Sequence, residues 1–184
     1  MSTNPLMKLI PELQAFLETV KLSMIHDLEF FIEREIINPK LRMFSFIYSY
    51  EDFKTVVYSL DHTGETITDV VGLPIINYKN LYATENYERF VPYAIEDKEH
   101  DICNHYDAFN NDKKMDEYWD FHDAYYTKKT NIFKIWFMEC WHIASKNTNT
   151  NVLALFAIHD SSGGVDLKTG TYLSDDEINT LFEN

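Results

Sequence analysis

The chain has 184 residues, 45% of them hydrophobic, and a formal net charge of −14, which fits one globular domain. This charge excludes attraction to nucleic acid or to an anionic membrane unless a basic patch overrides it, and the sequence contains no such patch. Two cysteines form no disulfide framework, and neither a signal peptide nor a membrane-spanning run is recognisable. We therefore expect a cytoplasmic protein with reduced thiols.

The first half of the chain predicts one long helix followed by short strands. Residues 11–36 place apolar side chains at three- and four-residue steps, and Pro39 ends the helix. Residues 42–49, 54–60 and 65–71 are short and rich in aromatic and β-branched side chains, with Gly64 in the second turn. These segments predict an antiparallel meander with the long helix over one face.

The second half predicts helices and one late strand. Residues 80–90 predict a short helix, and residues 92–109, 113–127 and 131–145 predict three more, each with an apolar face. Residues 152–159 form a near-continuous apolar run, as expected of a central strand buried on both sides. Ser174 and Glu177 match a capping box at the start of a terminal helix. The expected fold is a single α+β domain over residues 1–184, with a small, mostly antiparallel sheet packed by helices.

Acidic and aromatic side chains are interleaved between residues 96 and 126. This stretch holds ten acidic residues against three lysines, so its net charge of −7 is half of the chain's −14. On the predicted helix over residues 113–127 the aromatic side chains form one arc with a separate stripe of carboxylates beside it, and this arc is wider than one core-facing stripe normally requires. Large aromatic anchors inside a ring of carboxylates are typical of a surface that binds a basic protein. The alternative is a solvated acidic face beside ordinary core aromatics.

A metal site is a second interpretation of the same region. His100, Cys103 and His105 lie close together in sequence, and zinc requires three or four ligands that converge at about 2.0–2.3 Å. On a helix the two histidines point about 140° apart and cannot converge. We therefore predict no metal and no cofactor, and a helix surface with Asp101 near His105.

Catalytic chemistry has one candidate position. His159 ends the predicted central strand beside Asp160, and strand ends lead into site-forming loops. No nucleophile elbow accompanies it, Cys140 lies on a core-facing helix position where a thiol is inert, and phosphate-binding loops are absent. We predict no catalytic residue, with a small hydrolase centred on His159 as an alternative.

The layout resembles that of small acidic bacterial immunity proteins, which accompany polymorphic toxins. The resemblance lies in the long N-terminal helix, the aromatic strand Phe44-Ser45-Phe46-Ile47-Tyr48, the acidic and aromatic helical middle, and the apolar strand from Leu153 to Ile158. It covers most of the chain as architecture and brings no motif residue with it. It implies a cognate toxin as partner, often basic, whose active site the protein occludes in the cytoplasm.

The sequence therefore predicts a non-catalytic acidic protein that inhibits a basic partner, most simply a toxin. A phage-type anti-defence protein that mimics nucleic acid would use the same acidity and is a further alternative. The residues expected to bind the partner are six acids that steer it and three aromatic anchors: Asp97, Asp101, Asp107, Asp116, Asp120 and Asp123, with Tyr118, Trp119 and Tyr125.

Overall fold

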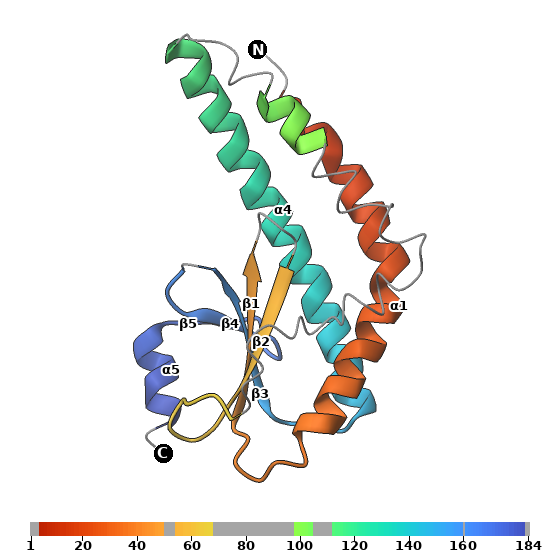
Figure 1. Ribbon diagram of the computed structural model, residues 1–184, viewed down its shortest axis with the longest axis vertical. Coiled ribbons are helices and arrows are strands. Elements are labelled where there is room, and N and C mark those ends of the chain that lie inside the picture. The colour runs from red at the N-terminus through yellow and green to blue at the C-terminus, as the bar shows by residue number, and fades with distance from the viewer. Residues whose placement is uncertain (1–3, 50–53, 68–97, 105–111, 160, 183–184) are drawn as a thin grey trace.

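Two long helices lie against one face of a five-stranded sheet, and a short C-terminal helix lies beside the sheet's far edge (Figure 1). The computed structural model describes residues 4–49, 54–67, 98–104, 112–159 and 161–182. Helices and a mixed sheet share one core, so the expected α+β class is confirmed.

The first long helix follows the sequence closely. A 3-10 turn, η1 (Leu6–Leu9), leads into α1 (Ile10–Glu35), which has Pro11 in its first turn, where the missing amide hydrogen costs nothing. The helix ends at Glu35, four residues before Pro39. Its apolar stripe, which includes Leu13, Leu28 and Ile32, is fully buried. The predicted helix over residues 11–36 is confirmed.

The sheet has the strand order β2-β1-β3-β4-β5. The strands are β1 (Met43–Ser49), β2 (Lys54–Leu60), β3 (Leu153–Ile158), β4 (Gly164–Asp166) and β5 (Tyr172–Leu173). Three of the four pairings are antiparallel, and only β1 with β3 is parallel. The mostly antiparallel sheet is confirmed, and β3 occupies its centre as expected of the apolar run.

The predicted third strand of the meander is found only in part. Thr66 forms an isolated antiparallel bridge with Leu60, and the Ile67 amide donates to the Ser59 carbonyl at 2.9 Å, but residues 68–71 lie outside the described residues. The second neighbour of β1 in the sheet is β3, which comes from the C-terminal part of the chain. Gly64 has φ +77°, a conformation that the turn requires and that L side chains rarely adopt.

One aromatic cluster joins both helices to the sheet. The Phe46 ring on β1 lies 5.1 Å from Phe137, 5.3 Å from Trp141 and 6.3 Å from Phe31, measured between ring centroids. Phe156 on β3 meets Phe137 at 5.5 Å. Since α1 and α4 contact the same side chains of β1, both helices cover the same face of the sheet.

The second long helix corrects the sequence prediction. Residues 113–127 and 131–145 were expected to form two helices, but α4 (Asp112–Asn147) is one continuous helix of 36 residues. The expected break at Lys128, Lys129 and Thr130 contains neither glycine nor proline, so nothing in the backbone interrupts the helix. Instead Lys129 is fully buried, which the sequence did not indicate.

Some of the remaining predicted elements are confirmed, and one lies outside the described residues. Residues 98–104 are helical, within the predicted helix 92–109, whereas the predicted helix 80–90 lies outside the described residues. The terminal helix α5 (Asp175–Phe182) follows the expected capping box. The Ser174 amide donates to Glu177 Oε2 at 2.8 Å, and the Glu177 amide donates to the Ser174 hydroxyl at 3.3 Å.

The aromatic cluster makes a stability prediction. Truncation of Phe137 to Ala removes a fully buried ring and should lower the free energy of unfolding by about 3–5 kcal/mol. Urea denaturation followed by circular dichroism measures the loss. The control is Ile143→Ala on the same helix, where the side chain is 41% exposed and a change within about 0.5 kcal/mol is expected. Equal losses in both variants would contradict the assigned core.

Candidate functional site: the outer half of α4

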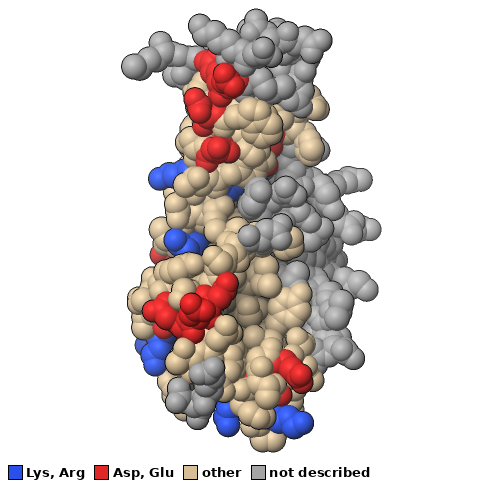
Figure 2. Space-filling model, turned by 90° about the vertical axis from the view of Figure 1, so that its left-hand side faces the viewer, with Lys and Arg blue, Asp and Glu red and all other residues tan. Residues whose placement is uncertain are grey.

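Three exposed carboxylates follow one another along the outer half of α4, which projects past the strands (Figure 1). Asp116, Asp120 and Asp123 are spaced by four and three residues, so they form one row on the helix surface. We call them the acidic stripe. Figure 2 shows acidic side chains gathered over this part of α4 and, separately, over α5. The acidic stripe is a fixed, solvent-facing row of negative charge.

The three predicted aromatic anchors do not share one environment. Trp119 is 52% exposed, as a contact residue must be, whereas Tyr118 is 7% exposed and Tyr125 is fully buried. The assignment of Tyr118 and Tyr125 as anchors is therefore wrong, because neither ring has surface to offer a partner. Tyr118 and Tyr125 are seven residues apart and lie on the same, buried side of α4, so part of the wide aromatic arc faces the interior of the protein.

Trp119 belongs to a ring cluster that borders the acidic stripe. Its centroid lies 5.1 Å from Tyr118 and 5.5 Å from His122, and the His122 ring lies 4.3 Å from Tyr126. His122 Nδ1 lies 3.5 Å from Asp123 Oδ1. The exposed tryptophan is thus supported from beneath by packed rings, which limits the rotamer entropy that binding would cost.

The other predicted acids have different positions. Asp101 is exposed on the helical segment 98–104, whereas Asp97 and Asp107 lie outside the described residues. Lys98 from the same segment pairs with Glu12 of α1 at 2.5 Å. Lys98 is therefore paired with a carboxylate outside the acidic stretch, and the three carboxylates of the acidic stripe stay exposed on α4.

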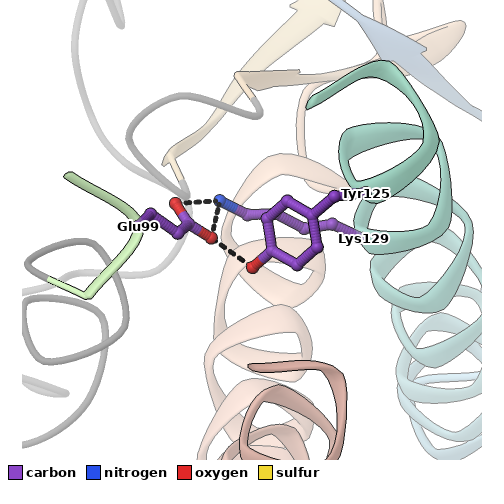
Figure 3. A network of polar contacts seen from close by, with 3 residues as sticks. All are labelled: Glu99, Tyr125 and Lys129. Carbon is purple, nitrogen blue, oxygen red and sulfur yellow. Dashed lines mark hydrogen bonds and ion pairs between the residues drawn. The ribbon is translucent and has the colours of Figure 1, made fainter. Parts of the chain in front are cut away.

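A buried ion pair attaches the segment 98–104 to α4. Lys129 Nζ donates to both carboxylate oxygens of Glu99 at 3.0 Å, and the Tyr125 hydroxyl donates to the same carboxylate (Figure 3). Glu99 is 4% exposed, and Lys129 and Tyr125 are 0% exposed. A buried charge is tolerated only when it is paired and hydrogen-bonded, and each charge here has its partner.

The environment of this network follows from its burial. Lys129 Nζ also lies 5.0 Å from the Tyr126 ring centroid and 5.9 Å from that of Tyr125, positions from which ring quadrupoles attract a cation. Burial, with the Glu99 charge next, raises the pKa of Tyr125 well above its usual value. Tyr125 therefore remains a hydrogen-bond donor. Sequence reasoning missed this network, since three polar residues spread over 31 positions carry no local pattern.

An open groove runs from the acidic stripe toward the sheet. One part, of about 420 Å³, is lined by His122, Asp123, Tyr126, Thr127, Thr130, Asn131 and Ile158. A second part, of about 570 Å³, shares Thr130, Asn131 and Ile158 and continues over Phe156, Val165 and the turn at residues 161–164 to Tyr172. Because the two parts share three lining residues, they adjoin each other between α4 and the strands β3 to β5.

In the part of the chain that the structure describes, the predicted catalytic and metal candidates lie in separate places. His159 is exposed and Cys140 is fully buried, and burial raises the pKa of the Cys140 thiol to about 12, so the thiol stays protonated. His100 and Cys103 lie on the helical segment, and His105 lies outside the described residues. Among the residues that the structure describes, no group of three or more His, Cys, Asp and Glu side chains could hold a metal.

Comparison with protein-family models, with curated proteins and with solved structures gives no significant match. Within the described part of the chain, no helix combines the length and apolar character that crossing a membrane requires. The function must therefore be argued from the surface of the molecule itself.

Removal of one partner from the buried pair should be costly. Lys129→Ala leaves the Glu99 carboxylate buried and uncompensated, so the free energy of unfolding should fall by about 3–5 kcal/mol. Lys128→Ala, at the exposed neighbouring position, is the matched control and should change it by less than about 0.5 kcal/mol. In the double variant Glu99→Gln/Lys129→Met the loss should be smaller than in Lys129→Ala. Equal losses for Lys128 and Lys129 would contradict the pair.

Asp27 of α1 makes a pH prediction. Burial raises its pKa to about 6, against a smaller opposing effect of His26, and no described residue bonds its buried Oδ2 atom. The folded state therefore binds more protons than the unfolded state between about pH 4 and 6. This contribution to stability is complete below about pH 4 and is lost as the pH rises through 6.

Asp27→Asn should remove this pH dependence. At pH 7 the variant should be more stable than the wild type by about 1–2 kcal/mol, with the difference disappearing near pH 4. Urea denaturation at pH 4, 5, 6 and 7 measures it, with exposed Glu33→Gln on the same helix as control. A difference that grows toward low pH would contradict the sign.

Proposed function

We propose that this protein is a non-catalytic inhibitor that binds a basic partner protein through the acidic stripe, and specifically an immunity protein that neutralises a bacterial toxin in the cytoplasm. The observation that carries the proposal is the row of exposed carboxylates beside the half-exposed Trp119 on one rigid helix. Carboxylates steer a basic protein and fix its orientation, while a supported tryptophan provides contact area.

The arrangement of charged and aromatic side chains on this surface favours binding of a protein over catalysis. Its charged groups are solvated and lie in a row, and its aromatic residue points outward, whereas a catalytic site gathers titratable groups in a concave, partly desolvated place. Charge on a helix that is packed along much of its length is already ordered before binding. Such preorganisation reduces the entropy lost on association.

Charge reversal tests the proposal. Tagged wild-type protein should capture one basic protein from the native source at low salt, and less of it at high salt. Asp116→Lys/Asp120→Lys/Asp123→Lys should abolish capture. The matched control is Glu33→Lys/Glu65→Lys/Asp176→Lys, which alters the net charge equally at exposed positions elsewhere and should retain capture.

Two outcomes would overturn the proposal. If both triple variants lose capture equally, net charge and not the acidic stripe governs binding. If the captured protein acts on nucleic acid, is displaced by DNA or RNA in competition and is not toxic in a host cell, this chain is a mimic of nucleic acid and not a toxin inhibitor. Toxicity of the captured protein in a host cell, suppressed by co-expression of this chain, is the result expected of an immunity protein.

A further inference from the structure

The groove beside the acidic stripe has the length and lining of a peptide site. It extends along α4 from Asp123 to Lys134, which is about 17 Å of helix at 1.5 Å per residue. An extended chain rises about 3.3 Å per residue, so the groove accommodates a segment of about five residues.

The wall and floor of the groove offer what an extended backbone needs. Ile158 and Val165 line it with half-buried apolar surface, while Thr130 and Asn131 place a hydroxyl and an amide along the α4 side. Opposite them, the Tyr172 hydroxyl donates to the Ser162 carbonyl at 2.6 Å. The turn beneath requires glycine at position 163, because φ there is +74° and a Cβ would lie 2.3 Å from the Leu173 carbonyl oxygen.

The two ends of the groove differ in charge. At one end Asp123 lies beside the rings of His122 and Tyr126, and at the other Lys134 donates to the Asn131 side-chain oxygen at 3.1 Å. A carboxylate next to aromatic rings suits a guanidinium group, which accepts stacking on a ring and bonds a carboxylate with two parallel donors. Lysine at the far end disfavours a second cation there.

We infer that this groove binds an extended segment of about five residues of the basic partner, with one arginine side chain seated between Asp123, His122 and Tyr126. The inference rests on the proposed function and deepens it. The acidic stripe attracts the partner over a distance, and the groove selects one segment of it. Charge complementarity at Asp123 and the length of the groove determine this occupant.

A peptide titration tests the groove without the partner. The probes are the acetylated and amidated pentapeptide Arg-Ala-Ser-Ala-Ala and the same peptide with citrulline, the neutral isostere of arginine. Amide resonances of residues that line the groove should shift saturably with the arginine peptide, and its affinity should exceed that of the citrulline peptide by about tenfold. Asp123→Asn should remove this difference, while Asp116→Asn, in the same stripe but outside the groove, should retain it.

A second pair of variants tests the groove without changing charge. Thr130→Trp fills the channel and should abolish the shifts, whereas Ala124→Trp, at an exposed position of α4 that does not line it, should not. Equal affinity of the arginine and citrulline peptides would contradict the proposal that the groove binds an arginine. Equal effects of Asp116→Asn and Asp123→Asn would contradict it as well. If the peptide fails to bind while reversal of the acidic stripe still abolishes capture, the groove is wrong and the proposed function stands.

Discussion

The buried contact of Glu99 with Lys129 and Tyr125 determines how the acidic region is presented. It joins two parts of the chain that are separated in sequence and attaches the segment 98–104 to α4 at the point where the helix passes the end of the sheet. A buried ion pair contributes little net stability compared with apolar residues of equal volume, but it accepts few alternative geometries. We infer that its role here is to fix the register of this segment on the helix.

This register affects α1 as well. Leu6, Leu9, Ile10 and Tyr125 form a small second core, against which Ile102 of the segment packs, and Lys98 pairs with Glu12. The start of α1, the segment 98–104 and the outer half of α4 therefore support one another. A helix that extends beyond its sheet would otherwise fray, and here it remains continuous to Asp112.

α4 thus has two parts with different tasks. Its inner part places Phe133, Phe137 and Trp141 in the aromatic core against the sheet. Its outer part buries Tyr125 and Lys129 on one side and exposes the acidic stripe and Trp119 on the other. The proposed binding surface therefore lies on the same rigid helix that packs in the core. A surface on such a helix is expected to be ordered before a partner binds.

Periodicity predicted most of the described fold, because helix and strand periods are local properties of the sequence. The bounds of α1, the central position of β3 and the capping box of Ser174 and Glu177 followed from such patterns. The continuity of α4 did not follow from the sequence, which predicts two helices with residues 128–130 between them, because only the distant Glu99 makes burial of Lys129 possible. Tyr118 and Tyr125 were wrongly predicted to be surface anchors. A helical wheel gives the direction in which a side chain points, but it does not show which other residues cover that side chain.

Photo-crosslinking in the native source shows which part of α4 contacts a partner, and so tests whether the acidic region is the binding surface. A benzophenone amino acid replaces Trp119 in the acidic region, and in a parallel variant it replaces Ile143, which is exposed on the inner part of the same helix. If the acidic region binds the partner, we expect one crosslinked basic protein from position 119 and none from position 143. A crosslink of equal yield at both positions, or from position 143 alone, would contradict it.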